Sequence, residues 1–175
     1  MTSPIVILEG PDGAGKSTLA RQLSDLLEVP VMHLGPPPEG ISALDQCLSM
    51  IMNNRTQYMG AVMDRFHIGE RIYGPLMRGV DTLGYDGQYL VEEGLLQLGA
   101  KMIVCLPPVE VCLENWRARK GAEYVQEEDK IHEIHSRYLS VESRLPTLVY
   151  DYTKQTMIPV LEFLEFLEVS RDVRA

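Results

Sequence analysis

Short apolar segments alternate along the chain with longer segments in which apolar residues recur every three or four positions. The short segments predict five strands, at 4–9, 29–34, 61–64, 102–106 and 147–152. The longer segments predict helices at 16–27, 41–54, 67–77, 86–98, 109–119 and 127–143 and a helical C-terminal region, with loops at 78–85 and 120–126. This alternation predicts an α/β fold, a three-layer sandwich in which helices cover both faces of a five-stranded parallel sheet.

Length and composition narrow the class of protein. A chain of 175 residues with 45% hydrophobic residues and a mean hydropathy near zero is expected to form one globular domain, 1–175. It contains no apolar run as long as a membrane span, and its start lacks the features of a signal peptide, so we expect a cytoplasmic protein that does not enter membranes. Cys47, Cys105 and Cys112 show no metal-binding spacing and are expected to be buried thiols.

The net charge bears on possible partners. A formal charge of −9 disfavours a protein that binds nucleic acid polymers, because such binding depends on neutralising backbone phosphates. A phosphorylated small molecule remains a possible ligand if arginines cluster locally. Open parallel sheets bind ligands beyond the carboxyl ends of their strands, so the loops after the first, third and fourth strands are the expected location of a site.

Residues 10–17 match G-x-x-x-x-G-K-[ST] at every fixed position, between a predicted strand and a predicted helix. In such a loop, glycines turn backbone N–H groups toward phosphates and the helix N-terminus adds its positive dipole end. Lys16 is expected to reach the β- and γ-phosphates of ATP, and Ser17 to offer a hydroxyl to Mg²⁺. The residues expected to bind ATP are Gly10, Asp12, Gly13, Ala14, Gly15, Lys16, Ser17 and Thr18. Since the chain has no guanine-reading N-K-x-D segment, a GTPase switch is disfavoured.

Asp64 and Arg65 close the predicted third strand at the carboxyl edge of the sheet, next to the phosphate loop. A carboxylate in this position can hold Mg²⁺, and a guanidinium can bind an acceptor phosphate through two hydrogen bonds. The simpler interpretation is a helix-capping Asp and a solvated Arg.

The phosphate loop and the segment after the third predicted strand resemble motifs of a known enzyme family. Residues 9–18 resemble the E-G-x-D-G-A-G-K-[ST]-T phosphate loop of thymidylate kinases, and residues 64–66 stand where that family has D-R-Y. Tyr73 has the spacing of the tyrosine in the family's D-R-Y-x-x-S-x-x-A-Y. The resemblance implies a P-loop kinase that transfers the γ-phosphate of ATP, with Mg²⁺, to a deoxynucleoside monophosphate. It implies Asp12 at the sugar 3′-hydroxyl, Arg65 at the phosphate and Tyr73 near the sugar or base of the acceptor, with Asp64 assisting the metal. Phe66 and Arg78 are further candidates for substrate binding, although a buried aromatic is the default interpretation of Phe66.

The chain also departs from the family pattern. Gly69 replaces the family serine and Ile72 the alanine, and the Phe and Arg that usually read thymine are not found. The segment 69–74, followed by Arg78 and Gly79, looks more like viral or otherwise divergent members. The base of the acceptor is therefore left open.

A predicted helix after the fourth strand ends in three cations and enters a short polar loop. Related kinases carry a mobile lid there, so 116–126 is expected to be a lid that brings Arg117 and Arg119 to the transferred phosphoryl group and excludes water. The alternative is a favourable interaction of these cations with the helix C-terminus. An apolar surplus on the predicted helix 86–98 is compatible with a homodimer, as in the resembled family.

Two further functions stay open. A deoxynucleoside kinase would need a carboxylate base for a sugar hydroxyl, and Glu9 or Asp64 could serve. A regulatory module that hydrolyses ATP slowly would need no acceptor site. A monophosphate acceptor, by contrast, is largely a dianion at pH 7 and needs no strong base, so positive charge and alignment should dominate its transfer reaction.

Overall fold

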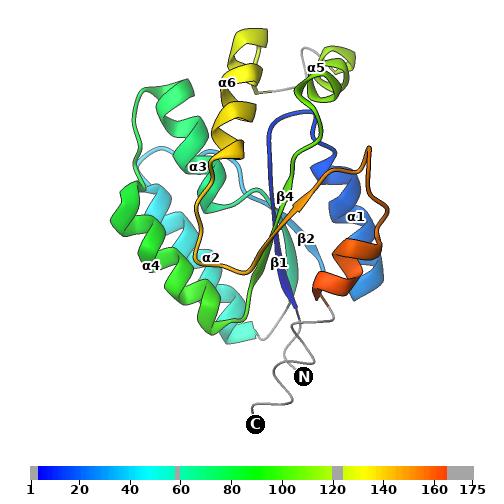
Figure 1. The fold of residues 1–175 in the computed structure, drawn as a ribbon. Coiled ribbons are helices and arrows are strands. Elements are labelled where there is room, and N and C mark those ends of the chain that lie inside the picture. Colours follow the sequence, from blue (N-terminus) through cyan, green and yellow to red (C-terminus); the bar gives the residue numbers. More distant parts are fainter. Residues whose placement is uncertain (1–3, 58–59, 120–123, 165–175) are drawn as a thin grey trace.

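The computed structural model describes residues 4–57, 60–119 and 124–164 and contains one five-stranded sheet (Figure 1). Its strands are β1 (Ile5–Glu9), β2 (Val31–His33), β3 (Ala61–Asp64), β4 (Lys101–Cys105) and β5 (Thr147–Tyr150). They lie in the order β2-β3-β1-β4-β5, and every neighbouring pair is parallel. The predicted α/β fold is confirmed.

Helices cover both faces of this sheet. One face carries α1 (Lys16–Leu27) and the helical residues 158–164, and the other carries α2 (Ala43–Gln57) and α4 (Gly84–Gln97) (Figure 1). At the carboxyl ends of the strands lie α3 (His67–Tyr73), α5 (Val109–Ala118) and α6 (Glu128–Leu139) (Figure 1). In the described residues, no helix combines the length and the apolar character needed to cross a bilayer.

The three central strands form the core. Every residue of β1, β3 and β4 is buried, as expected for parallel strands that helices cover on both sides. Cys47, Cys105 and Cys112 are buried and form no disulfide, which confirms the expectation of core thiols. The rigid centre of the sheet thus holds the ends of β1 and β3, from which the phosphate loop and the Asp-Arg pair emerge.

Several helix boundaries differ from the sequence prediction. The predicted helix 41–54 is α2, Ala43–Gln57. The predicted helix 67–77 is α3 followed by a π-helical turn, η1 (Gly74–Arg78), with Pro75 in its first turn, where a missing N–H is tolerated. The predicted loop 78–85 is shorter, because the Asp81 carboxylate accepts hydrogen bonds from the backbone of Leu83 and Gly84 and starts α4 there. The predicted helix 127–143 ends at Leu139.

Candidate active site

The phosphate loop joins β1 to α1, as predicted, and packs tightly on its neighbours. Gly13 and Gly15 have φ values of 78° and 82°, which side chains rarely adopt. A Cβ atom on Gly10 would lie 2.3 Å from the carbonyl oxygen of Cys105, and one on Gly13 would lie 2.1 Å from that of Cys112. These glycines therefore serve the packing of the loop against β4 and α5 as well as the approach of phosphates.

Lys16 is only 6% exposed and bends over the loop, where its Nζ donates a hydrogen bond to the carbonyl oxygen of Pro11 at 2.6 Å. Burial, and to a smaller extent the charge of Arg65, lowers its pKa from the ordinary 10.5 to about 8. A poorly solvated ammonium group of this kind gains a counter-charge when anionic phosphates bind.

Ser17 and Asp64, the expected metal ligands, are in direct contact. The Ser17 hydroxyl donates to Asp64 Oδ2 at 2.9 Å, and the His33 Nδ1 atom lies 3.7 Å from the same oxygen. Asp64 Oδ1 is buried and has no hydrogen-bond partner among the described residues. A hydroxyl next to a carboxylate with one unused oxygen fits the hard oxygen ligands that Mg²⁺ prefers.

Arg65 occupies a strained backbone position. Its φ is 72°, in the left-handed region, while its backbone N–H donates to the carbonyl oxygen of Leu8 at 2.9 Å. The guanidinium group pairs with Asp12 and lies 4.7 Å from the centre of the Tyr73 ring. The Tyr73 hydroxyl also donates to Asp12, at 3.3 Å. Asp12, Arg65 and Tyr73, which the resemblance assigns to one substrate, are in direct contact.

Glu9 holds the turn after β3. It is fully buried, and its carboxylate accepts hydrogen bonds from the backbone N–H groups of Phe66 at 2.9 Å and Gly69 at 3.1 Å and from the Tyr138 hydroxyl at 3.0 Å. These bonds fix the direction of Arg65. Sequence reasoning missed this positioning role, since it depends on three partners that lie 57 to 129 residues away.

A cavity of about 260 Å³ opens beyond the carboxyl ends of β1 and β3. The predicted acceptor-binding residues that line it are Asp12, Arg65, Phe66, Tyr73 and Arg78. Arg78 pairs there with the buried Glu70, whose Oε1 also accepts a bond from Thr82 at 3.2 Å. A second, smaller cavity of about 130 Å³ follows the phosphate loop from Asp12 to Thr18 and includes Asp64 and Arg119. Both cavities are lined by Asp12, His33 and Arg65, so they are adjacent at these residues.

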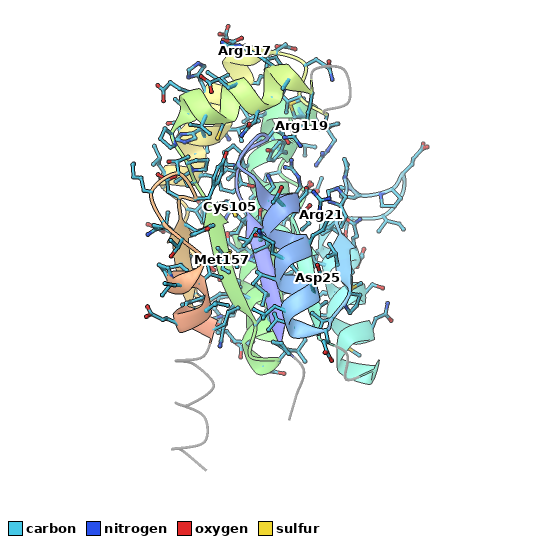
Figure 2. The ribbon with its side chains drawn as sticks, turned by 90° about the vertical axis from the view of Figure 1, so that its right-hand side faces the viewer. Arg21, Asp25, Cys105, Arg117, Arg119 and Met157 are labelled. Carbon is cyan, nitrogen blue, oxygen red and sulfur yellow. The ribbon has the colours of Figure 1, made fainter. Side chains whose placement is uncertain are left out.

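The two arginines at the end of α5 lie apart. Arg119 lines the phosphate-loop cavity, whereas Arg117 is 52% exposed and pairs with Glu128 of α6. Figure 2 shows Arg117 at the outer end of the molecule and Arg119 closer to α1. Of these two arginines, Arg119 alone lines the cavity at the phosphate loop. Residues 120–123 of the predicted lid lie outside the described residues.

A third hollow, of about 700 Å³, adjoins the other side of the phosphate loop. Thr18, Cys105, Asn115, Arg119, Tyr152 and Met157 are among the residues that line it. Asn115 Nδ2 donates to the carbonyl oxygen of Gly13 at 2.8 Å and to the Tyr152 hydroxyl at 2.9 Å. Sequence reasoning did not single out Asn115, Tyr152 or Met157, because no motif marks them and they come from α5 and the segment after β5.

Similar structures were found, although no family model and no curated protein matches the sequence. The YorR protein from Bacillus subtilis, crystallised with phosphorylated GDP, is 21% identical over 98% of both chains, with a TM-score of 0.71. A deoxyadenosine kinase from M. mycoides is 15% identical and covers 94% of this chain and 99% of its own, with a TM-score of 0.56. A gluconokinase from Sinorhizobium meliloti 1021 is 14% identical over 99% of this chain and 97% of its own, with a TM-score of 0.59.

The chain has the P-loop kinase fold. At sequence identities of 14% to 21%, the similarity to these structures shows a shared fold and nothing more. In this P-loop kinase fold, the two cavities that share Asp12, His33 and Arg65 lie at the carboxyl edge of the sheet, where open α/β sheets bind their ligands.

Proposed function

We propose that this protein transfers the γ-phosphate of ATP to a deoxynucleoside monophosphate. The observation that carries the proposal is the position of Arg65, which lines both the phosphate-loop cavity and the cavity beyond it. A guanidinium group at this junction can bind the acceptor phosphate with two hydrogen bonds while it faces the donor phosphates. The relatives of similar fold support a nucleotide ligand, since YorR holds phosphorylated GDP and the deoxyadenosine kinase holds dATP or dCTP.

Each part of the site has a task in this reaction. The phosphate loop and Lys16 bind the β- and γ-phosphates, and the ammonium group neutralises charge that develops during transfer. Ser17 and Asp64 would hold Mg²⁺, which when bound neutralises the donor phosphates and helps to align them. Arg119 lines the same cavity, which supports a role in binding the transferred phosphoryl group.

The acceptor side supports a phosphate more than a hydroxyl as the nucleophile. A nucleoside 5′-hydroxyl would need a carboxylate base, but Glu9 is fully buried and already accepts three hydrogen bonds. Asp64 is engaged by Ser17 at the proposed metal site. A monophosphate dianion needs no base, and Arg65 must only exchange Asp12 for the phosphate.

The assay that tests the proposal measures ADP release from Mg-ATP with each deoxynucleoside monophosphate, with the matching nucleosides and without acceptor. We expect release that depends on a monophosphate. Release only with nucleosides would instead favour a deoxynucleoside kinase, and acceptor-independent release would favour a regulatory ATPase. Retention of full transfer by Lys16→Ala would contradict the assignment of the phosphate loop.

Arg65→Ala separates the acceptor site from the donor site. We expect kcat/KM for the monophosphate to fall on the order of 100-fold, because a partly buried charged contact to the acceptor is lost. ATP binding, measured by calorimetry, should stay within a few fold of the original protein. The matched control is Arg137→Ala, since Arg137 is exposed on α6 and, among the described residues, its side chain pairs with the helix neighbour Glu133. Equal loss of ATP binding in Arg65→Ala would count against the assignment.

A further inference from the structure

The acceptor cavity has a polar pair at the end away from the phosphate loop. Glu70 of α3 and Arg78 of η1 line the acceptor cavity, and neither lines the phosphate-loop cavity. Arg65, in contrast, lines both. An acceptor whose phosphate is bound by Arg65 therefore directs its opposite end toward Glu70 and Arg78.

The Glu70 carboxylate is only partly satisfied by the protein. Its side chain is 8% exposed, and Oε1 accepts hydrogen bonds from Arg78 and Thr82. Oε2 makes no hydrogen bond with the described residues. Oε2 is therefore open to a hydrogen bond from a ligand N–H group in the cavity.

The local backbone makes room for this pair. The π-helical turn brings Arg78 back over Glu70, and such turns are frequent at functional sites. Gly74 lies between them: a Cβ atom there would stand 3.1 Å from Glu70 Oε1, 3.2 Å from Arg78 Nη2 and 2.7 Å from the backbone oxygen of Val80. The absence of a side chain at this position is what allows a carboxylate and a guanidinium group to face the cavity together.

We propose that Glu70 and Arg78 read the base of the acceptor nucleotide, a specificity role that rests on the proposed function. Glu70 Oε2 accepts a hydrogen bond from an N–H group of the base, and Arg78 donates to the neighbouring acceptor atom on the same edge. Guanine and thymine offer a ring N–H next to a carbonyl oxygen, whereas adenine and cytosine offer an amino group next to a ring nitrogen. The pair thus recognises a base edge with adjacent donor and acceptor atoms, and the order of these atoms decides which class binds.

The test compares kcat/KM for dGMP, dTMP, dAMP and dCMP between the original protein and Glu70→Gln. This substitution keeps the shape of the side chain and changes its hydrogen-bonding pattern. We expect kcat/KM for the preferred monophosphate to fall about tenfold or more, the discrimination that one good base contact provides. The other monophosphates should change less, so the preference shrinks or reverses, while KM for ATP is unchanged. The matched control is Glu133→Gln, since Glu133 is exposed on α6 and pairs with Arg137.

Arg78→Gln provides a second variant if Glu70→Gln fails to fold, and the same loss of preference is expected. An unchanged ratio among the four monophosphates in a folded, active variant would overturn the base-reading role. If the original protein transfers phosphate to no monophosphate, the proposed function is wrong, and the role is then judged from calorimetric binding of the same four ligands. Base-dependent binding that Glu70→Gln abolishes would support the role, and binding without base preference would overturn it.

Discussion

Lys16 carries a charge in a position from which water is nearly excluded. Its folded-state pKa of about 8 lies below the ordinary 10.5, mainly because burial penalises the charged form. Below pH 8 the side chain is charged in the folded and the unfolded chain alike, so the full penalty opposes folding. Between pH 8 and 10.5 the folded protein releases its proton first, and this contribution to stability becomes more favourable as pH rises.

Lys16→Met should therefore be more stable than the original protein at pH 7, although it is expected to be inactive. We expect the free energy of unfolding to rise by about 1–3 kcal/mol, less than the pKa difference alone implies because the bond to Pro11 is lost. The gain should shrink between pH 8 and 10.5. Urea unfolding over this pH range measures the difference in the free energy of unfolding. The control is Lys154→Met, since the Lys154 side chain is 72% exposed. A variant less stable than the original at pH 7 would contradict this account.

At the scale of elements, the phosphate loop is held by its close approach to β4. Gly10 has a φ of 141°, and its missing Cβ leaves room for the carbonyl oxygen of Cys105 at the end of that strand. A backbone atom cannot move aside as the end of a flexible side chain can. Any side chain at position 10 would therefore clash with β4 and push it away from β1.

We expect Gly10→Ala to lower the free energy of unfolding by about 3 kcal/mol or more through this overpacking. Gly40→Ala is the matched control: Gly40 also has a positive φ, of 78°, but a Cβ atom there would meet no atom within 4 Å. The control should cost only the backbone strain of about 1–2 kcal/mol. Thermal unfolding of both variants measures the difference, and equal midpoints would contradict the role of close packing.

At the scale of the whole molecule, Glu92 of α4 links three distant segments. Its buried carboxylate contacts His67 Nε2 at 3.1 Å and accepts hydrogen bonds from Gln88 at 2.9 Å, the Ser143 hydroxyl at 2.7 Å and the Arg144 backbone at 3.0 Å. Burial alone would raise its pKa, but these hydrogen bonds lower the pKa to about 2. The network joins the helix behind the Asp-Arg pair to α4 and to the segment before β5.

Glu92 should consequently contribute to acid stability. With a folded-state pKa below the ordinary 4.5, its contribution is complete above pH 4.5 and is lost as pH falls toward 2. Glu92→Gln is expected to lower the free energy of unfolding at pH 7 by about 1–3 kcal/mol and to flatten its decline between pH 4.5 and 2. The control is the neighbouring Glu93→Gln, which removes an exposed pair with Arg144. Parallel acid unfolding curves for Glu92→Gln and the original protein would refute the role.

A homodimer through α4 stays a prediction. Tyr85, Tyr89 and Leu90 are exposed on this helix by 80%, 54% and 51%, while Val91 and Leu95 face the core. If these exposed side chains form the contact, Leu90→Glu should convert the dimer to a monomer in analytical ultracentrifugation. A monomeric original protein would contradict the prediction.

The sequence by itself determined the local features of this protein. The alternation of apolar segments predicted the fold, and the G-x-x-x-x-G-K-[ST] pattern predicted a strand, a phosphate loop and a helix where they are observed, because these features depend on neighbouring residues. The position of Asp64 next to the phosphate loop also followed, since parallel strands bring their carboxyl ends to one edge.

The tertiary structure decided the contacts between distant segments. It separated Arg117 from Arg119, which are two positions apart in sequence: Arg117 pairs with Glu128 of α6, whereas Arg119, which follows the last residue of α5, lines the phosphate-loop cavity. It ended α6 four residues before the predicted end, where Ser143 contacts Glu92, and it placed Glu9 beneath the Asp-Arg turn. Such bonds depend on which surfaces meet after the chain has folded, and periodicity along a single segment carries no information about them.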